Sequence, residues 1–311
     1  SDDVFLGVLP QFHCFGLTAL TLVPMLFGCK VVYTARFVPK KIIELMRSHR
    51  PSIYVAIPSM YNALMTVKTA MPEDFTSLRL AISGGEPLPD DVRSRFRERF
   101  EISIVEGYGL TETSPVTHVL LPEENRAGTV GRPVPNLEQI VVDPATDQVL
   151  PPNTDGELRM RGPNIMKGYL GLCEESANAF DGRGFFRTGD MAQIDEEGFL
   201  RITGRIKEML IVGGENVFPR EIEEVLNAHP SVHDSGVIGQ QDPMRGEVPI
   251  AFVEPTEDHA ADPEELVRWC RDNLPGYKVP RRVVVIEALP RNPTGKIMRR
   301  LLKPELEKRE A

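Results

Sequence analysis

Residues 40–109 alternate between the pattern of amphipathic helices and the pattern of short buried strands. Residues 40–49 carry apolar side chains on one side of a helix that Pro51 ends. A second helix, after residue 87, repeats apolar side chains four residues apart, at Leu88, Val92, Phe96 and Phe100. Strands are predicted at residues 53–57, 78–82 and 102–105. Because a helix lies between strands, the strands are expected to run parallel in one sheet, which predicts an α/β fold for this part of the chain.

Each of the last two strands runs into a turn that contains glycines. The first turn holds Gly84, Gly85, Glu86 and Pro87, and the second holds Gly107, Tyr108 and Gly109. Ligands of parallel sheets bind beyond the carboxyl ends of the strands, so one ligand could touch both turns. Glycines let a flat ligand approach the backbone, and a tyrosine ring between them can lie on a purine. Two tight turns that hold no ligand are the alternative.

Further polar residues could complete a nucleotide site. Thr111 can donate to a phosphate oxygen, and Glu112 can hold Mg²⁺, which prefers carboxylate oxygens together with phosphates. Asp190 could accept both hydroxyls of a ribose, and Arg205 could complete that clamp or reach a phosphate. Lys296 follows a proline and a glycine in an exposed turn, from which its long stem could reach an oxyanion. Taken singly, each residue could equally be a cap or a surface charge.

The remainder of the chain changes twice in composition and in residue pattern. Residues 116–202 are rich in proline, glycine and short strands, which indicates a small antiparallel barrel or sheet with a hairpin turn at residues 195–198. A second domain is expected from residue 206, with helices that begin at Pro219 and after Asp262. We therefore expect a mixed α/β and α+β chain. Its domains would be residues 1–205 (α/β to 115, then β-rich to 205) and an α+β domain, residues 206–311.

Composition restricts the partners and the location. A formal net charge of −9 argues against a nucleic acid, because a phosphate backbone needs a basic face. The 4 cysteines show no close pairing, so a reducing compartment, the cytoplasm, is expected. Residues 15–29 form the most apolar run, but they are too few to cross a membrane, and a buried helix with its turn is predicted there.

Ten short motifs in order resemble the adenylate-forming superfamily, which includes acyl-CoA synthetases, nonribosomal peptide adenylation domains and firefly luciferase. They lie at residues 9–13 (LPQFH), 83–88 (SGGEPL), 107–112 (GYGLTE), 156–162 (GELRMRG), 167–169 (KGY), 186–190 (FRTGD), 204–208 (GRIKE), 213–216 (GGEN), 219–223 (PREIE) and 292–296 (NPTGK). The resemblance covers nearly the whole chain. It implies the C-terminal part of a large AMP-binding domain, with a parallel sheet and a small β-barrel, followed by a mobile α+β domain.

The resemblance also implies a reaction in two halves. A carboxylate attacks the α-phosphate of ATP to give acyl-AMP and pyrophosphate, and a thiol, usually that of CoA, then takes the acyl group and releases AMP. The implied roles are as follows: adenine contacts for residues 84–87 and Tyr108 with its flanking glycines; phosphate and Mg²⁺ for Thr111 and Glu112; ribose for Asp190 and Arg205; and the adenylation transition state for Lys296. His13 would line the acyl pocket. Lys207 would be the hinge of a rotation that brings Gly213, Gly214 and Glu215 toward the thiol.

One familiar motif is missing. The superfamily carries a Ser/Thr/Gly-rich phosphate loop upstream of the LPQFH position, and this sequence has none. We therefore expect the chain to be the C-terminal part of a longer enzyme whose N-terminal part is its partner. An exposed apolar face should then remain on its first subdomain.

The acid and the class of function stay open at this point. The motifs at residues 213–223 and 292–296 look most like those of medium- or long-chain fatty-acyl-CoA synthetases. Aryl and short-chain acids remain alternatives, as does a carrier-protein thiol in place of CoA, or another adenylating enzyme. A non-catalytic module that binds acyl groups or AMP competes from another class. The missing phosphate loop favours such a module, whereas Lys207 and Lys296 favour a catalyst.

Overall fold

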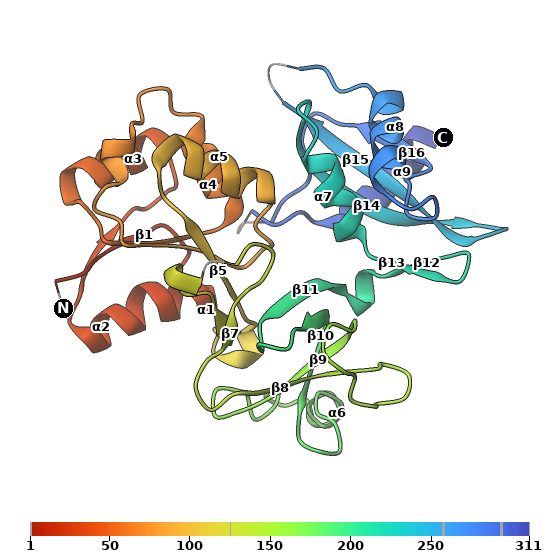
Figure 1. Ribbon diagram of the computed structural model, residues 1–311, viewed down its shortest axis with the longest axis horizontal. Coiled ribbons are helices and arrows are strands. Elements are labelled where there is room, and N and C mark those ends of the chain that lie inside the picture. The colour runs from red at the N-terminus through yellow and green to blue at the C-terminus, as the bar shows by residue number, and fades with distance from the viewer. Residues whose placement is uncertain (1, 125, 257–258, 293–294, 311) are drawn as a thin grey trace. The chain divides into compact units, whose positions relative to one another are not determined.

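The computed structural model describes residues 2–124, 126–256, 259–292 and 295–310 (Figure 1). The chain divides into two compact units. The first comprises Ser1–Thr188 with Ala192–Ile202, and the second comprises Gly189–Met191 with Thr203–Ala311. Within the described parts of both units, no helix combines the length and the apolar character needed to cross a bilayer.

A seven-stranded sheet forms the α/β part of the first unit. Its order is β2-β1-β3-β4-β5-β6-β7, and β1 to β5 pair in parallel. The strands are β1 (Val4–Gly7), β2 (Lys30–Tyr33), β3 (Ile53–Ala56), β4 (Leu80–Ser83), β5 (Ile104–Tyr108), β6 (His118–Val119) and β7 (Arg132–Pro133). The predicted parallel α/β arrangement is confirmed. The strand expected to stop at residue 105 continues to Tyr108, because β6 pairs antiparallel with Gly107 and Tyr108.

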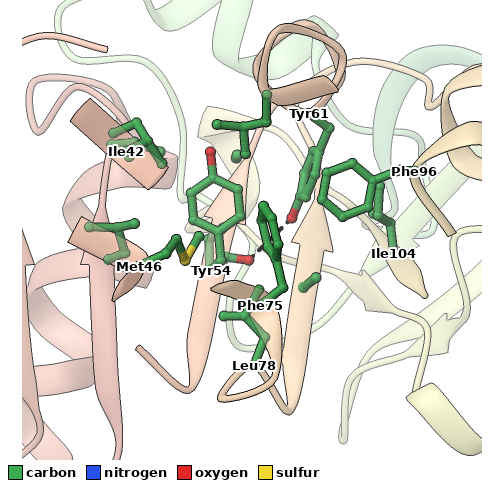
Figure 2. Packing of buried hydrophobic residues seen from close by; sticks show 14 of the residues in the cluster. Ile42, Met46, Tyr54, Tyr61, Phe75, Leu78, Phe96 and Ile104 are labelled. Carbon is green, nitrogen blue, oxygen red and sulfur yellow. Dashed lines mark hydrogen bonds between the residues drawn. The ribbon is translucent and has the colours of Figure 1, made fainter. Parts of the chain in front are cut away.

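Helices cover both faces of this sheet. Figure 1 shows α3 (Pro39–His49), α4 (Pro58–Met65) and α5 (Asp90–Phe100) on one face, with α1 (Cys14–Leu17) and α2 (Val23–Phe27) on the other. Beneath the first group, rings meet edge to face, at 5.2 Å between the centroids of Tyr61 and Phe96 and 5.6 Å for Phe75 and Phe96 (Figure 2). The Tyr61 hydroxyl donates to the Ile82 carbonyl at 2.9 Å. This bond ties α4 to the end of β4, where the first glycine turn begins.

The helical run from Cys14 to Phe27 is less buried than the sequence analysis predicted. It is helical as predicted, but only Gly16, Leu20 and Pro24 are buried. The prediction that this helix is buried was wrong, because only one stripe of the helical run packs on the sheet. Five of its apolar side chains are exposed: Leu17, Leu22, Met25, Leu26 and Phe27. An exposed apolar face on this part of the chain, expected from the resemblance, is therefore present.

A four-stranded sheet, β11-β10-β9-β8, follows along the chain. Its strands are β8 (Glu138–Val142), β9 (Gly156–Arg161), β10 (Phe186–Ile194) and β11 (Leu200–Arg205), and the helix α6 (Cys173–Asn178) lies between β9 and β10 in sequence. The hairpin turn at residues 195–198 is confirmed. Its first carboxylate, Asp195, accepts from the Glu197 and Phe199 amides at 2.9 Å each.

The second unit is built on a five-stranded sheet of order β13-β12-β15-β14, with β16 parallel to β15. Its elements are β12 (Leu210–Val212), β13 (Glu215–Val217), α7 (Pro219–Asn227), β14 (Val232–Asp242), β15 (Gly246–Pro255), α8 (Pro263–Asn273), β16 (Arg282–Val285) and α9 (Leu302–Glu310). Both predicted helix starts are confirmed: α7 begins at Pro219, and the Asp262 carboxylate accepts from the Glu264 amide at 3.0 Å ahead of α8.

Candidate functional site

The two predicted glycine turns lie against each other in the first unit. A Cβ atom built on Gly84 would come within 3.3 Å of the Gly107 carbonyl oxygen and 3.0 Å of the Phe15 ring. No side chain larger than hydrogen fits there without a shift of backbone or ring. The turn after β4 and the end of β5 therefore form one continuous surface beside the start of α1.

A buried carboxylate that the sequence analysis missed holds this surface. Glu106, on β5, accepts from the Leu88 amide at 3.2 Å and forms an ion pair with Arg93 of α5. Because Leu88 directly follows Gly84, Gly85, Glu86 and Pro87, the bond fixes the far end of that turn. Only the position of Glu106 at the end of a strand could have indicated it.

Tyr108 ends β5 and lies half-buried over a histidine. Its ring centroid is 6.0 Å from that of His118, the residue opposite it on β6. The His118 ring contacts the Thr117 hydroxyl at 3.0 Å and the Gln139 side-chain oxygen at 2.8 Å. Burial lowers the pKa of His118 to about 4, against the opposing effect of the Gln139 hydrogen bond. The ring behind Tyr108 is therefore uncharged near neutral pH.

Thr111 and Glu112 follow Gly109 in a short turn. The Thr111 side chain is exposed, and its hydroxyl lies 3.3 Å from the Cys14 sulfur. One oxygen of Glu112, Oε1, accepts from the Tyr169 hydroxyl at 3.0 Å. Thr113 is the buried cap of this turn, since its hydroxyl accepts from the Leu110 amide at 2.9 Å. Thr113 therefore caps this turn, while the neighbouring Thr111 keeps an exposed side chain.

Tyr169 is a further residue near Glu112 to which the sequence analysis gave no role. The segment that carries it is pinned to the turn twice more: the Met166 amide donates to the Glu112 carbonyl at 2.8 Å, and the Asn164 side chain donates to the Thr113 carbonyl at 3.1 Å. The sequence signal available for this segment was the glycine before Tyr169, Gly168, which has a φ of 147° in the structure. The Glu112 carboxylate is therefore held in place from residues more than 50 positions away.

His13 caps α1, whose second residue contacts Gly84. Its ring Nδ1 accepts from the Phe15 amide at 3.3 Å, and Phe15 is the residue whose ring lies against Gly84. The structure thus places His13 two residues from the side chain that lies against the first glycine turn.

Asp190 and Arg205 form an ion pair in the second unit. Arg205 Nε lies 2.8 Å from Asp190 Oδ1, and the Asp190 side chain is 3% exposed whereas that of Arg205 is 54% exposed. The arginine therefore holds a carboxylate that is almost withdrawn from solvent. The pair sits on the adjacent strands β10 and β11.

The other predicted residues of the second unit lie in three turns. Lys207 is exposed in the turn Ile206–Glu208. Gly213, Gly214 and Glu215 are exposed at the β12–β13 hairpin, where the Gly213 amide donates to the Arg245 carbonyl at 2.7 Å. Lys296 is half-buried, and its amide donates to the Asn292 side chain at 2.9 Å. Pro293 and Thr294 of the NPTGK motif lie outside the described residues.

Each unit thus holds a separate set of the predicted site residues. In the first unit a glycine surface, an aromatic ring, a hydroxyl and a carboxylate adjoin, which suits a purine nucleotide. Over residues 2–124, 126–256, 259–292 and 295–310, no group of three or more His, Cys, Asp or Glu could hold a metal ion by itself. A cation near Glu112 would need further ligands from a bound molecule, as Mg²⁺ commonly takes from phosphates.

Comparison with known proteins matches both parts of the chain to family models. Residues 1–170 match the model of the AMP-binding enzyme, and residues 221–296 match that of the AMP-binding enzyme C-terminal domain. The long-chain-fatty-acid--CoA ligase of Bacillus subtilis (strain 168) is 36% identical over 301 residues, which are 96% of this chain and 54% of that protein. The feruloyl-CoA synthase of an Amycolatopsis species is also 36% identical over 301 residues, 96% of this chain and 61% of that protein. The chain therefore spans little more than half the length of these curated relatives.

Solved structures share the fold. ATP-bound MatB from Rhodopseudomonas palustris superposes with a TM-score of 0.93 at 32% identity, covering 98% of this chain and 60% of that one. The o-succinylbenzoate CoA synthetase of Bacillus subtilis, in complex with ATP and a magnesium ion, gives a TM-score of 0.85 at 33% identity, with coverages of 97% and 61%.

Proposed function

Since this chain belongs to the AMP-binding enzyme family, we propose that the gene product that carries it activates a carboxylic acid with ATP and transfers the acyl group to the thiol of CoA. In the first half, a carboxylate oxygen bonds to the α-phosphorus and pyrophosphate leaves. In the second half, the thiol sulfur bonds to the acyl carbon, its proton is released, and AMP leaves. The observation that carries the proposal is the surface at the ends of β4 and β5, with Tyr108, Thr111 and Glu112 beside it.

The first unit would bind the nucleotide. One face or edge of the adenine would lie against the turn formed by Gly84, Gly85, Glu86 and Pro87. Tyr108, between Gly107 and Gly109, would stack on the adenine. The close contact of Gly84 with Gly107 supports a single flat ligand against both turns. Thr111, which is exposed, would donate to a phosphate oxygen.

Glu112 would be a ligand of Mg²⁺. Its Oε1 accepts from Tyr169, which orients the carboxylate and leaves Oε2 as the atom to face a cation. When bound, Mg²⁺ would neutralise charge on the pyrophosphate that leaves. The magnesium ion in the o-succinylbenzoate CoA synthetase complex supports this part of the proposal.

The second unit would supply the ribose clamp and the adenylation charge. Asp190, held by Arg205 at 2.8 Å, would accept from the ribose hydroxyls. Lys296 would donate to the oxygens on which charge develops during adenylation. Lys207 would be the hinge between the two halves of the reaction, and Gly213, Gly214 and Glu215 would then meet the thiol arm.

We expect Tyr169→Phe to weaken the contribution of Mg²⁺ to nucleotide binding by about threefold to tenfold, because Glu112 loses a hydrogen bond to its charged oxygen. Calorimetric titration of ATP with and without Mg²⁺ measures that contribution apart from any turnover. Tyr33→Phe is the matched control, since its hydroxyl donates to the Leu20 carbonyl instead. The same Mg²⁺ dependence in Tyr169→Phe and wild type would contradict the orienting role of Tyr169.

A medium- or long-chain fatty acid is the acid class that we propose, with His13 lining its pocket. The similarity to a long-chain-fatty-acid--CoA ligase supports it, whereas the equal identity to a feruloyl-CoA synthase favours an aryl acid as the second candidate. Product thioesters formed from a panel of acetate, octanoate, palmitate, ferulate and 4-coumarate, with ATP and CoA, decide between them. The highest kcat/KM with octanoate or palmitate is expected. A higher value with ferulate or 4-coumarate would replace the fatty acid by an aryl acid.

A further inference from the structure

The guanidinium group of Arg299 joins three separate segments of the second unit. It makes two parallel bonds to Glu223 of α7, Nε to Oε1 at 3.0 Å and Nη2 to Oε2 at 2.7 Å. Its third nitrogen, Nη1, donates to Glu208 Oε2 at 3.0 Å. Arg299 itself opens the short turn Arg299–Leu301 before α9. One side chain therefore links the C-terminal segment, α7 and the turn that contains Lys207.

The Glu223 end of this link is buried and rigid. The Glu223 side chain is 11% exposed, and its Oε1 also accepts from the Val237 amide of β14 at 2.8 Å. The Glu208 end is more open, with its side chain 37% exposed. A planar fork with fixed donors suits such an arrangement, because it can satisfy one carboxylate with two bonds and still reach a second.

Lys296 lies three residues before Arg299 on a segment that is clamped on both sides. On the preceding side, Arg291 forms an ion pair with Asp234 at 2.6 Å and donates to the Gly295 carbonyl at 3.2 Å. The Asn292 amide donates to the Lys296 carbonyl at 2.9 Å, and the Met298 amide donates to the Pro290 carbonyl at 2.7 Å. These bonds join residues 290–292 to residues 295–298, and the two described stretches around Lys296 are here called the lysine clip.

The lysine clip also packs on the sheet through the residue after Lys296. A Cβ atom on Gly236 of β14 would lie 3.3 Å from Ile297 Cγ2 and 3.0 Å from Leu302 Cδ1. Ile297 packs against the cluster that contains Leu289 and Leu302. Packing thus holds the clip against β14, while the direction in which the clip continues to α9 is set by Arg299.

We propose that Arg299 is a positioning residue for Lys296, which it fixes relative to Glu208 and α7. The proposal rests on the proposed function, in which Lys296 acts in adenylation and Lys207 is the hinge. Because Glu208 directly follows Lys207 and is bonded to Arg299, the body that carries Lys296 begins at Glu208. The pivot is then confined to residues before Glu208, and the lysine clip moves as one piece with α7.

The test compares the two halves of the reaction in the gene product that carries this chain. Arg299→Met should lower kcat for acyl-AMP formation by about 10- to 100-fold, since a small displacement of a catalytic group is costly, with little change in the KM for ATP. Thioester formation from synthetic acyl-AMP should stay within about threefold of wild type, because Lys296 is not used there. Arg299→Lys, which keeps the charge and loses the fork, should recover only part of the rate. Arg300→Met, at the exposed neighbouring arginine, is the matched control and should behave as wild type.

Amide hydrogen exchange supplies a second measurement that needs no turnover. Arg299→Met should raise exchange at the Lys296 and Met298 amides, whose hydrogen bonds close the lysine clip, and leave the amides of β15 unchanged. Glu208→Gln should raise it less, because the bonds to Glu223 remain. Full adenylation activity in Arg299→Met, an equal loss in both halves, or unchanged exchange in the clip would overturn the proposal. If the wild type forms no acyl-AMP, the proposed function fails, and the exchange of the clip amides alone decides whether Arg299 anchors the clip.

Discussion

Replacement of Lys296 by alanine is expected to slow acyl-AMP formation by about 10²- to 10³-fold, the usual cost of removing one donor from a developing oxyanion. The structure supports this size of effect because the lysine clip holds the backbone on both sides of Lys296 through Asn292 and Arg291. Because this backbone is already fixed, the Lys296 side chain loses less conformational freedom when its ammonium group reaches the transition state. The rate of acid-dependent exchange between ATP and pyrophosphate measures the step directly.

AMP affinity separates a catalytic role from loss of the site. It should change little in Lys296→Ala, because the adenine and ribose residues belong to other turns. Lys303→Ala, at an exposed lysine of α9, serves as the control for a lost surface charge and should keep the wild-type rate. If Lys296→Ala kept the wild-type exchange rate, the role assigned to Lys296 would be incorrect, whereas a lack of exchange in the wild type would favour a module that only binds acyl groups or AMP.

Arg159→Met is expected to give the largest loss of stability, about 3–5 kcal/mol in the free energy of unfolding. The Arg159 side chain on β9 is fully buried, 2.8 Å from Glu157 and 3.1 Å from Asp181, and it also pairs with Asp147. Burial alone would raise the pKa of Asp181, but hydrogen bonds from the Phe185 amide and from Arg183 outweigh it and lower the pKa to about 2. Asp181 is therefore ionised near neutral pH. Without Arg159 it keeps Arg183 and the Phe185 amide as partners, whereas the buried Glu157 is left with Arg187 at 3.8 Å.

Arg161 offers a control two residues away on the same strand. Its side chain is 45% exposed and pairs with the exposed Glu138 at 2.7 Å, so Arg161→Met should change stability little. Urea unfolding followed by far-ultraviolet circular dichroism compares the two variants. Equal unfolding midpoints for Arg159→Met and wild type would show that the buried cluster does not stabilise the fold.

Signals that lie close together in sequence predicted most of the fold. Alternating helix and strand patterns indicated the parallel sheet, and proline and aspartate marked the starts of α7 and α8. The glycine turns after two parallel strands were expected to meet, and Gly84 lies against Gly107. These features depend on backbone geometry and on spacing within a few residues, which a single sequence displays.

Contacts between distant residues could not be predicted in the same way. Tyr169 reaches Glu112 across 57 residues, and Arg299 reaches Glu223 across 76 and Glu208 across 91. No pattern in the sequence pairs a given arginine with a given carboxylate at such a separation. Tyr108 was placed in a turn for the same reason, since its strand pairing depends on β6, ten residues further on.

The most direct test of the central claim follows one oxygen atom through the reaction. The gene product that carries this chain is supplied with ATP, CoA and an acid whose carboxylate oxygens carry a heavy isotope. The masses of the products are measured by mass spectrometry. Attack of the carboxylate on the α-phosphorus leaves one acid oxygen on the phosphate, so AMP with a single heavy oxygen is predicted beside unlabelled pyrophosphate. Labelled inorganic phosphate with ADP would indicate an acyl phosphate instead, and it would contradict the adenylation account.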